Sequence, residues 1–122
     1  MNRYIYFASR DEVYRINASQ IVLFIADGNY TFMQLSSGQK IAFTLSLQKM
    51  QNYLAEKLGD DARTFARIGK AHIINLSYIY HIDVARQRLR LLCEDSGKEY
   101  PISVSKEALK KLKETLISSQ QS

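Results

Sequence analysis

The sequence has 122 residues and a formal net charge of +5, from 17 Lys and Arg against 12 Asp and Glu. Hydrophobic residues make up 46% of the chain and charged residues 24%, a composition that can bury a core and that excludes disordered and fibrous classes. No apolar run approaches the roughly 20 residues that span a bilayer. The positive charge favours an anionic partner such as a nucleic acid or a membrane surface, but it is equally compatible with a role in solubility alone.

The N-terminal sequence and the cysteine content favour the cytoplasm. The first 15 residues lack the apolar segment and cleavage site of a signal peptide. Cys93 is the one cysteine and cannot form an internal disulfide. We therefore expect a cytoplasmic protein without a membrane segment, in which residues 1–122 form one domain.

The first part of the chain has the pattern of antiparallel strands. Residues 4–7 and 13–16 alternate in polarity and predict a Tyr-rich β-hairpin. Residues 21–26 are apolar on both faces, as in a central strand that is covered on each side or a strand that begins under a cap. A tight turn at Asp27-Gly28-Asn29 follows, and strands are expected at 30–35 and 40–45. This region is most simply an antiparallel meander.

The hydrophobic period becomes helical after residue 45. An amphipathic helix that lies on the sheet is predicted by four apolar residues and a glycine cap, namely Leu47, Met50, Leu54, Leu58 and Gly59. Further strands are expected at 64–68, 71–74, 78–84, 88–93 and 98–102. A last helix, capped by Ser103 or Ser105, completes a mainly β (α+β) fold.

No combination of residues predicts catalysis, a metal site or a cofactor. His72 and His81 are nine positions apart, which matches no zinc-ligand spacing, and both lie in apolar strands where packed or hydrogen-bonded structural histidines are expected. Cys93 shares a face with Leu89 and Leu91, so we interpret it as a small buried hydrophobic residue. The sequence also lacks phosphate-loop and hydrolase motifs. We expect neither enzymatic activity nor a small-molecule substrate.

Basic and polar residues gather at turns, in residues 29–31, 67–70 and 103–106. Lys and Arg neutralise phosphate charge, Asn and Ser donate hydrogen bonds, and a helix N-terminus offers free N–H groups to an anion. Each turn alone is also compatible with an ordinary solvated loop. A second basic cluster, either a DNA flank or a solvated strand face, consists of Arg86, Arg88 and Arg90.

Five segments, taken in order, resemble the LytTR family of bacterial DNA-binding domains, which usually form the C-terminal domain of response regulators. The segments are IVLFIADGNYTFMQL (21–35), LSL (45–47), FARIGKAHIIN (65–75), Tyr78-Ile79 and PISVS (101–105). The resemblance covers residues 5–116. It implies an elongated arrangement of small antiparallel sheets, one helix in mid-chain and one at the C-terminus, without a helix-turn-helix.

The resemblance also implies that loops at the sheet ends enter successive major grooves of double-stranded DNA. It assigns Arg67 and Lys70 mainly to phosphate, with Lys70 also able to reach guanine. The remaining implied contacts, to base edges or phosphates, are Asn29, Thr31, Gly69, Ser105 and Lys106. Tyr30 is at least as consistent with core packing beside Phe32 as with a DNA contact.

The chain departs from the family pattern in the Arg67 loop. Where members often have Arg-Ile-His-Arg-Ser, this sequence has Gly69 and Ala71 in place of His and Ser, and Lys106 stands where Arg is common. We expect weaker base specificity with the positive charge retained. If the chain is complete, it carries no receiver domain, so its regulation must come from elsewhere.

The sequence therefore predicts a sequence-specific transcription regulator, acting on paired direct-repeat half-sites with a homodimer on DNA as one arrangement. The first alternative is a protein-interaction module that kept the fold and lost DNA readout, with Tyr4, Tyr6 and Tyr14 of the hairpin as its exposed patch. The second is single-strand or RNA binding on a β-surface. It is less favoured because the basic residues lie at turns rather than around aromatic rings.

Overall fold

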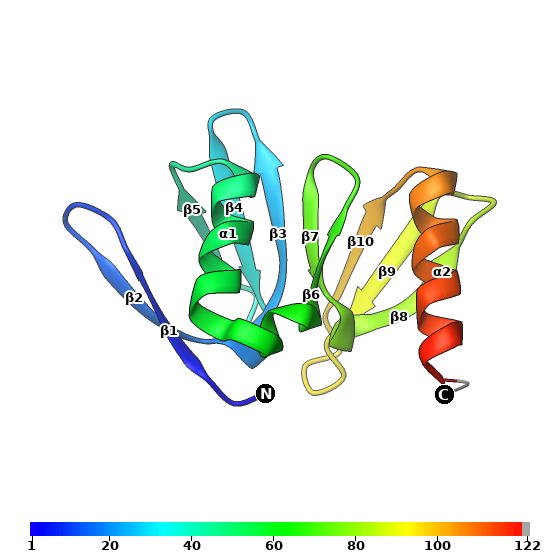
Figure 1. Cartoon of the computed structure of the whole chain (residues 1–122), viewed down its shortest axis with the longest axis horizontal. Coiled ribbons are helices and arrows are strands. Elements are labelled where there is room, and N and C mark those ends of the chain that lie inside the picture. Colours follow the sequence, from blue (N-terminus) through cyan, green and yellow to red (C-terminus); the bar gives the residue numbers. More distant parts are fainter. Residues whose placement is uncertain (121–122) are drawn as a thin grey trace. The chain divides into compact units, whose positions relative to one another are not determined.

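The computed structural model describes residues 1–120, which contain ten β-strands and two α-helices (Figure 1). The contacts divide the chain into two compact units, the first from Met1 to Ser77 and the second from Tyr78 onward. All strand pairs in the described residues are antiparallel. The mainly β prediction is confirmed, whereas the prediction of a single domain stays a prediction.

The first unit begins with a two-stranded hairpin of β1 (Tyr4–Ala8) and β2 (Val13–Asn17), as the alternation predicts. Ile5 and Phe7 are buried, while Tyr4 and Tyr6 on the other face are exposed. The strand pattern therefore gives the hairpin one face toward the core and one toward solvent.

A five-stranded sheet follows in the order β5-β4-β3-β7-β6. Its strands are β3 (Ile21–Asp27), β4 (Tyr30–Leu35), β5 (Lys40–Phe43), β6 (Phe65–Ile68) and β7 (His72–Asn75). The first four residues of the central strand β3 are all buried, so the prediction of a strand covered on both faces is confirmed. The meander is also confirmed, although β5 ends two residues before Leu45 because residues 44–46 turn into the following helix.

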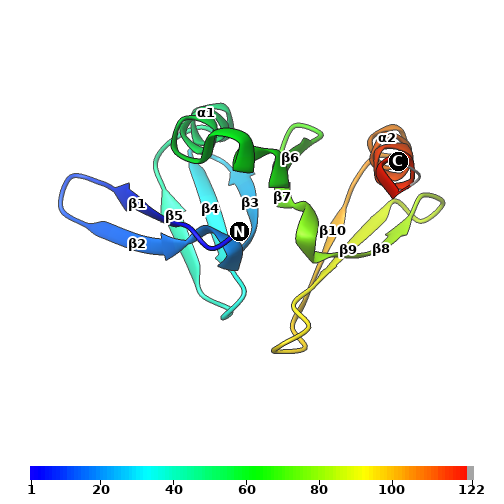
Figure 2. The same cartoon turned by 60° about the horizontal axis from the view of Figure 1, so that its bottom comes forward.

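Helix α1 (Leu47–Leu58) lies over one face of this sheet (Figures 1 and 2). Its four apolar residues at helical spacing are all buried, in one core with Phe24, Met33 and Ile73 of the sheet. Burial of each such side chain contributes about 1.5–3 kcal/mol. The helix begins at the N-cap Ser46, whose Oγ accepts a hydrogen bond from Lys49 N at 3.1 Å, and ends at Gly59, with φ 57°.

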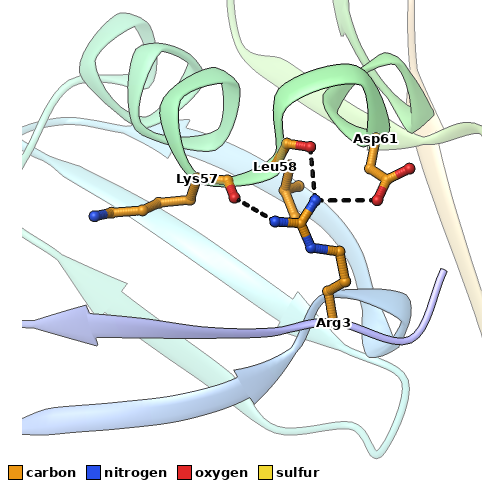
Figure 3. Close-up of polar contacts among 4 residues, drawn as sticks. All are labelled: Arg3, Lys57, Leu58 and Asp61. Atoms are coloured by element: carbon orange, nitrogen blue, oxygen red, sulfur yellow. Dashed lines mark hydrogen bonds and ion pairs between the residues drawn. The ribbon is translucent and has the colours of Figure 1, made fainter.

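Arg3 attaches the N-terminal segment to the C-terminal end of α1 (Figure 3). Its Nη1 donates to Leu58 O at 2.8 Å and to Asp61 Oδ2 at 3.1 Å, and its Nη2 donates to Lys57 O at 2.9 Å. The last carbonyls of a helix have no intrahelical donor, and a cation is favoured beside them. Tyr53 of α1 adds a second link, because its hydroxyl donates to Tyr6 O. The hairpin is thus joined to α1 by polar contacts as well as by its buried face.

The second unit is a three-stranded sheet in the order β10-β9-β8, followed by α2 (Lys106–Gln120). The strands are β8 (Ile79–Asp83), β9 (Arg88–Leu92) and β10 (Glu99–Ser103). Leu89, Leu91 and Cys93 are buried on one side, as predicted, together with Leu109 and Leu112 of α2.

Two details of the chain differ from expectation. Thr64 belongs to a 3₁₀ segment (Gly59–Thr64), so β6 starts one residue later than predicted. His81 is exposed on β8, so its interpretation as a packed histidine is wrong, whereas His72 is half-buried. Within residues 1–120 no helix is long and apolar enough to cross a membrane. Five strands separate α1 from α2, so the same residues hold no helix-turn-helix.

Candidate nucleic-acid interface

Three connections of the first unit lie at the same end of the five-stranded sheet: the β3–β4 turn, the β6–β7 turn and the segment from β5 into α1. Antiparallel pairing brings them together, because β3 ends at this end of the sheet and its neighbour β7 starts there. Ala26 N donates to Ala71 O at 2.8 Å and ties the first two connections together. Figure 1 shows these turns at one end of the sheet. Residues some 40 positions apart in sequence are therefore neighbours here.

The β3–β4 turn is a two-residue loop. Asp27 pairs with Tyr30 across the ladder, and Gly28 takes the positive φ of 61° that such tight hairpin turns require. Asn29 is exposed at the tip. Its amide, with both donor and acceptor groups, faces solvent on a short backbone loop whose ends are held by the ladder.

Thr31 follows the turn, but its side chain points into the protein, whereas that of Asn29 is exposed. The side chain of Thr31 is fully buried, and its Oγ1 donates to Leu45 O at 2.7 Å. A hydroxyl whose hydrogen is given to a backbone carbonyl inside the core has no free donor for a base edge. The prediction that Thr31 contacts DNA is therefore corrected: its hydroxyl anchors the connection between β5 and α1.

Tyr30 also differs from the packing interpretation. The strand alternation does place it on the same face as Phe32, with ring centroids 6.0 Å apart. That face is opposite to the one that carries the buried Thr31, Met33 and Leu35, and Tyr30 is 47% exposed. The ring lies at the surface beside the turn rather than in the core.

The β6–β7 turn is built around Gly69 and Lys70. Gly69 has a φ of 63°, a conformation that L-residues with a Cβ rarely adopt. Lys70 is exposed, and within residues 1–120 no acidic side chain lies within ion-pair distance of it. Its ammonium group is therefore free to meet an anion at this end of the sheet.

Arg67 precedes this turn and is held by two hydrogen bonds. Its Nη1 donates to Gln51 Oε1 of α1 at 3.1 Å, and its Nη2 donates to Lys70 O at 3.1 Å. Its Nε is buried without a hydrogen-bond partner among the described residues, an arrangement that costs about 1–3 kcal/mol. The guanidinium of Arg67 is half-buried and hydrogen-bonded within the protein. An arginine that served only to contact phosphate would be more exposed and would have fewer hydrogen bonds within the protein.

In the second unit, the predicted contact residues Ser105 and Lys106 lie at the start of α2. Ser105 Oγ accepts from Ala108 N at 3.2 Å, so Ser105, rather than Ser103, is the N-cap. Both residues are exposed. The hydroxyl hydrogen of Ser105 is not used by the cap, and the first N–H groups and the dipole of the helix favour negative charge at this point.

The arginine cluster of the second unit is partly neutralised. With His81, Asp83 and Glu99 it lines a polar hollow of about 310 Å³. Arg90 Nη2 donates to Glu99 Oε2 at 3.0 Å, and this hydrogen bonding holds the pKa of Glu99 below its usual value. Arg86 lies 3.9 Å from Asp83. Arg88 forms no ion pair within 4.0 Å among residues 1–120, although its charge also contributes to the lowered pKa of Glu99.

Sequence reasoning missed two participants in this arrangement. Gln51 lies on a helix 16 positions before Arg67, and the backbone carbonyl of Leu45 lies 14 positions after Thr31. A glutamine beside the apolar stripe of a helix has no recognisable sequence pattern. A backbone carbonyl has none either, because every residue has one. Their roles follow from the packing of α1 against the sheet.

The comparisons with known proteins agree on one family. The family model for the LytTr DNA-binding domain matches residues 11–117. Among solved structures, the LytTr DNA-binding domain of a Bacillus cereus protein described as a methyl-accepting/DNA response regulator has a TM-score of 0.63 and 21% sequence identity. The match covers 93% of this chain and 95% of that chain, and at this identity it shows a shared fold. No curated protein matches the chain.

Proposed function

The chain belongs to the LytTR family of DNA-binding domains, and from this premise we propose that it is a sequence-specific transcription regulator in the bacterial cytoplasm. In this proposal, turns at the sheet ends and the start of α2 enter successive major grooves on direct-repeat half-sites. Its partner is double-stranded DNA, with a homodimer forming on the duplex.

The observation that carries the proposal is that the β3–β4 and β6–β7 turns lie side by side at one end of the sheet. The hydrogen bond from Ala26 N to Ala71 O holds them side by side, and each presents one exposed polar side chain, Asn29 and Lys70. An amide suits base edges and an ammonium suits phosphate or guanine. An ammonium group and an amide on neighbouring turns are a suitable combination for positioning and reading a duplex.

The other predicted contacts take distinct roles in this proposal. Gly69 lets the backbone of the turn approach the duplex, since it has no side chain at the tip. Ser105 and Lys106 meet phosphate with a hydroxyl, an ammonium and the N-terminal N–H groups of α2. Arg67 supplies positive charge behind the turn, while Thr31 is left out of the contact set.

Selection of bound duplexes from a random pool tests this function directly. We expect a recovered site with two similar half-sites, whose spacing reports how protomers are arranged. The logarithm of the binding constant should fall with the logarithm of salt concentration at a slope of about −4 to −6, as expected for roughly five to seven neutralised phosphates. Salt-independent binding, or no binding to any pool member, would falsify the proposal.

Lys70→Ala tests the role of the turn. We expect weaker binding to every sequence and a salt slope that is flatter by about 0.9, because one phosphate contact is lost. Lys57→Ala is the matched control. Lys57 is exposed in the last turn of α1, at the end of the helix away from the β6–β7 turn, and its amine lies 5.5 Å from the centroid of the Tyr53 ring. Equal salt slopes for the two variants would remove Lys70 from the interface.

The exposed hairpin favours a second candidate function, a protein-interaction module. Tyr4, Tyr6 and Val13 are 49%, 59% and 63% exposed and share the outer face of β1 and β2. Tyr14, the third residue of the predicted patch, lies opposite Phe7 on the other face, with its ring 6.3 Å from that of Phe43. Exposed aromatic side chains of this kind are common in protein interfaces. Size-exclusion chromatography with and without duplex separates the two functions. An assembly that Tyr6→Ser abolishes and DNA does not affect would support this candidate.

A further inference from the structure

We infer that Gln51 of α1 is a positioning residue that holds the β6–β7 turn, through Arg67, in the geometry that presents Lys70 to DNA. This inference deepens the proposed function and rests on it. It assigns a part in DNA recognition to a neutral residue on a helix that does not itself carry the contact side chains.

The sheet register explains how Gln51 and Arg67 meet. Arg67 is opposite Ile73 in the β6–β7 ladder, so both side chains leave the sheet on the same face. Ile73 belongs to the core under α1, which means that Arg67 also points to the α1 side. Gln51 is half-buried beside the apolar stripe of α1, and its Oε1 accepts from Arg67 Nη1 at 3.1 Å.

The same guanidinium then reaches the turn. Its Nη2 donates to Lys70 O at 3.1 Å, so one rigid planar group connects the helix with the backbone of the contact residue. The β6–β7 ladder holds the ends of the turn, where Ile68 pairs with His72. At its tip, beyond the immediate chain neighbours, no described atom lies within 4 Å of the point where a Cβ would stand on Gly69. The hydrogen bonds from Arg67 and from Ala26 N therefore add restraint to a turn whose tip is open.

The role of Gln51 differs from a DNA contact in a measurable way. Gln51 is uncharged, so removing its amide changes the order of the turn and leaves the number of neutralised phosphates the same. Each Nη of Arg67 also keeps a second hydrogen for an anion, so the guanidinium can hold the turn and add its charge at once. A loss of affinity at constant salt slope is the signature of positioning.

The test is Gln51→Met, which keeps the length of the side chain and removes its acceptor. We expect affinity for the selected duplex to fall about threefold to tenfold, the range for one lost hydrogen bond, with the salt slope unchanged. Gln48→Met is the matched control, because Gln48 lies one turn earlier on α1 and bonds to Asn52 rather than to Arg67. It should bind as the wild type does.

A double-mutant cycle with Arg67→Met supplies the second readout. If Gln51 acts through Arg67, the double variant should bind about as well as Arg67→Met alone. Backbone amide exchange at Ala26, whose N–H donates to Ala71 O at the end of the turn, should quicken in Gln51→Met without DNA and stay at the wild-type rate in Gln48→Met. Additive losses, or unchanged exchange at this amide, overturn the inference.

These readouts separate the inference from the function on which it rests. If the wild type binds no selected duplex, the proposed function fails whatever the exchange rates show, and the assigned part in DNA recognition fails with it. If the wild type binds and Gln51→Met binds equally well, the function stands and the positioning role is overturned.

Discussion

At the residue scale, adjacent side chains on β4 differ in burial. Tyr30 is exposed beside the turn, whereas Thr31 is fully buried and Phe32 is half-buried under the Lys40 amine, which lies 4.8 Å from its ring centroid. Strand alternation sets this pattern, because neighbouring side chains leave opposite faces of the sheet. Polar residue type alone therefore misleads at Thr31, whose hydroxyl is satisfied inside the core by a backbone carbonyl.

Thr31→Val should destabilise the fold by about 0.5–1.5 kcal/mol, because the part-buried hydrogen bond from Thr31 to the Leu45 carbonyl is lost. Urea denaturation measures this change in the free energy of unfolding. Thr44→Val, on the exposed neighbouring segment, is the control and should stay within about 0.5 kcal/mol of the wild type. Equal stability of the two variants would contradict the structural role of Thr31.

His72 should make stability depend on pH. Burial lowers the pKa of His72 from its ordinary value of 6.5, so the unfolded chain takes up a proton at a higher pH than the native protein does. Below about pH 6.5 the unfolded state binds more protons, and stability falls as pH drops further, until the native histidine also protonates. The urea midpoint should decrease between pH 7.5 and 5.5.

His72→Gln should flatten this pH dependence, and the exposed His81 provides the comparison. His81→Gln replaces an exposed histidine of β8 and should leave the slope of stability against pH near the wild-type value. A parallel loss of slope in both variants would mean that burial of His72 is not its cause.

At the element scale, the contact candidates lie where elements begin or end. Gly28 and Gly69 supply the positive φ values of 61° and 63° at two turns, and Ser105 closes the first turn of α2. At these positions the backbone is fixed by a tight turn or by a helix cap, so each side chain starts from a well-defined point of the fold. Elements provide rigidity, and their termini provide the groups that can meet DNA.

Ser105 variants should separate capping from DNA contact. Ser105→Ala removes the cap and costs about 1 kcal/mol, whereas Ser105→Asp keeps an acceptor for Ala108 N and retains stability. The aspartate also places negative charge where phosphate is proposed to lie, so Ser105→Asp should bind DNA more weakly than Ser105→Ala despite its greater stability. Thermal unfolding of both variants checks the predicted stabilities, and duplex binding by both variants checks the predicted affinities. Stronger binding by the aspartate variant would exclude Ser105 from the interface.

At the scale of the whole molecule, the family match runs across both compact units, from residue 11 to residue 117. The candidate contacts are likewise divided: Asn29, Gly69 and Lys70 belong to the first unit, while Ser105 and Lys106 belong to the second. Each unit has its own buried residues and its own helix. The proposed function therefore predicts that both units contribute contacts to one duplex.

The double variant Lys70→Ala/Lys106→Ala tests this requirement. If each lysine neutralises one phosphate, the salt slope should flatten by about 0.9 for each single variant and by about 1.8 for the double variant. Lys57→Ala/Lys113→Ala removes the same charge from other exposed positions and should change the slope less. A double variant with the slope of one single variant would show that only one unit contacts the duplex.

Much of the fold was determined by the sequence alone. The hairpin, the central β3, the meander and α1 were all predicted, because period-two and helical spacing record which side chains face a core. Four buried apolar residues and Gly59 set the extent of α1, and the ordered motifs identified the family. These signals are local, so they survive without knowledge of which strands pair.

The tertiary structure decided what those local signals leave open. It placed the β6–β7 turn beside the β3–β4 turn, buried Thr31, exposed Tyr30 and His81, and engaged Arg67 with Gln51. Each of these outcomes depends on contacts between residues far apart in the chain, which set burial and hydrogen-bond partners that no sequence window contains. The residue types at the candidate interface could be read from the sequence, but only packing decided which of them are free to meet DNA.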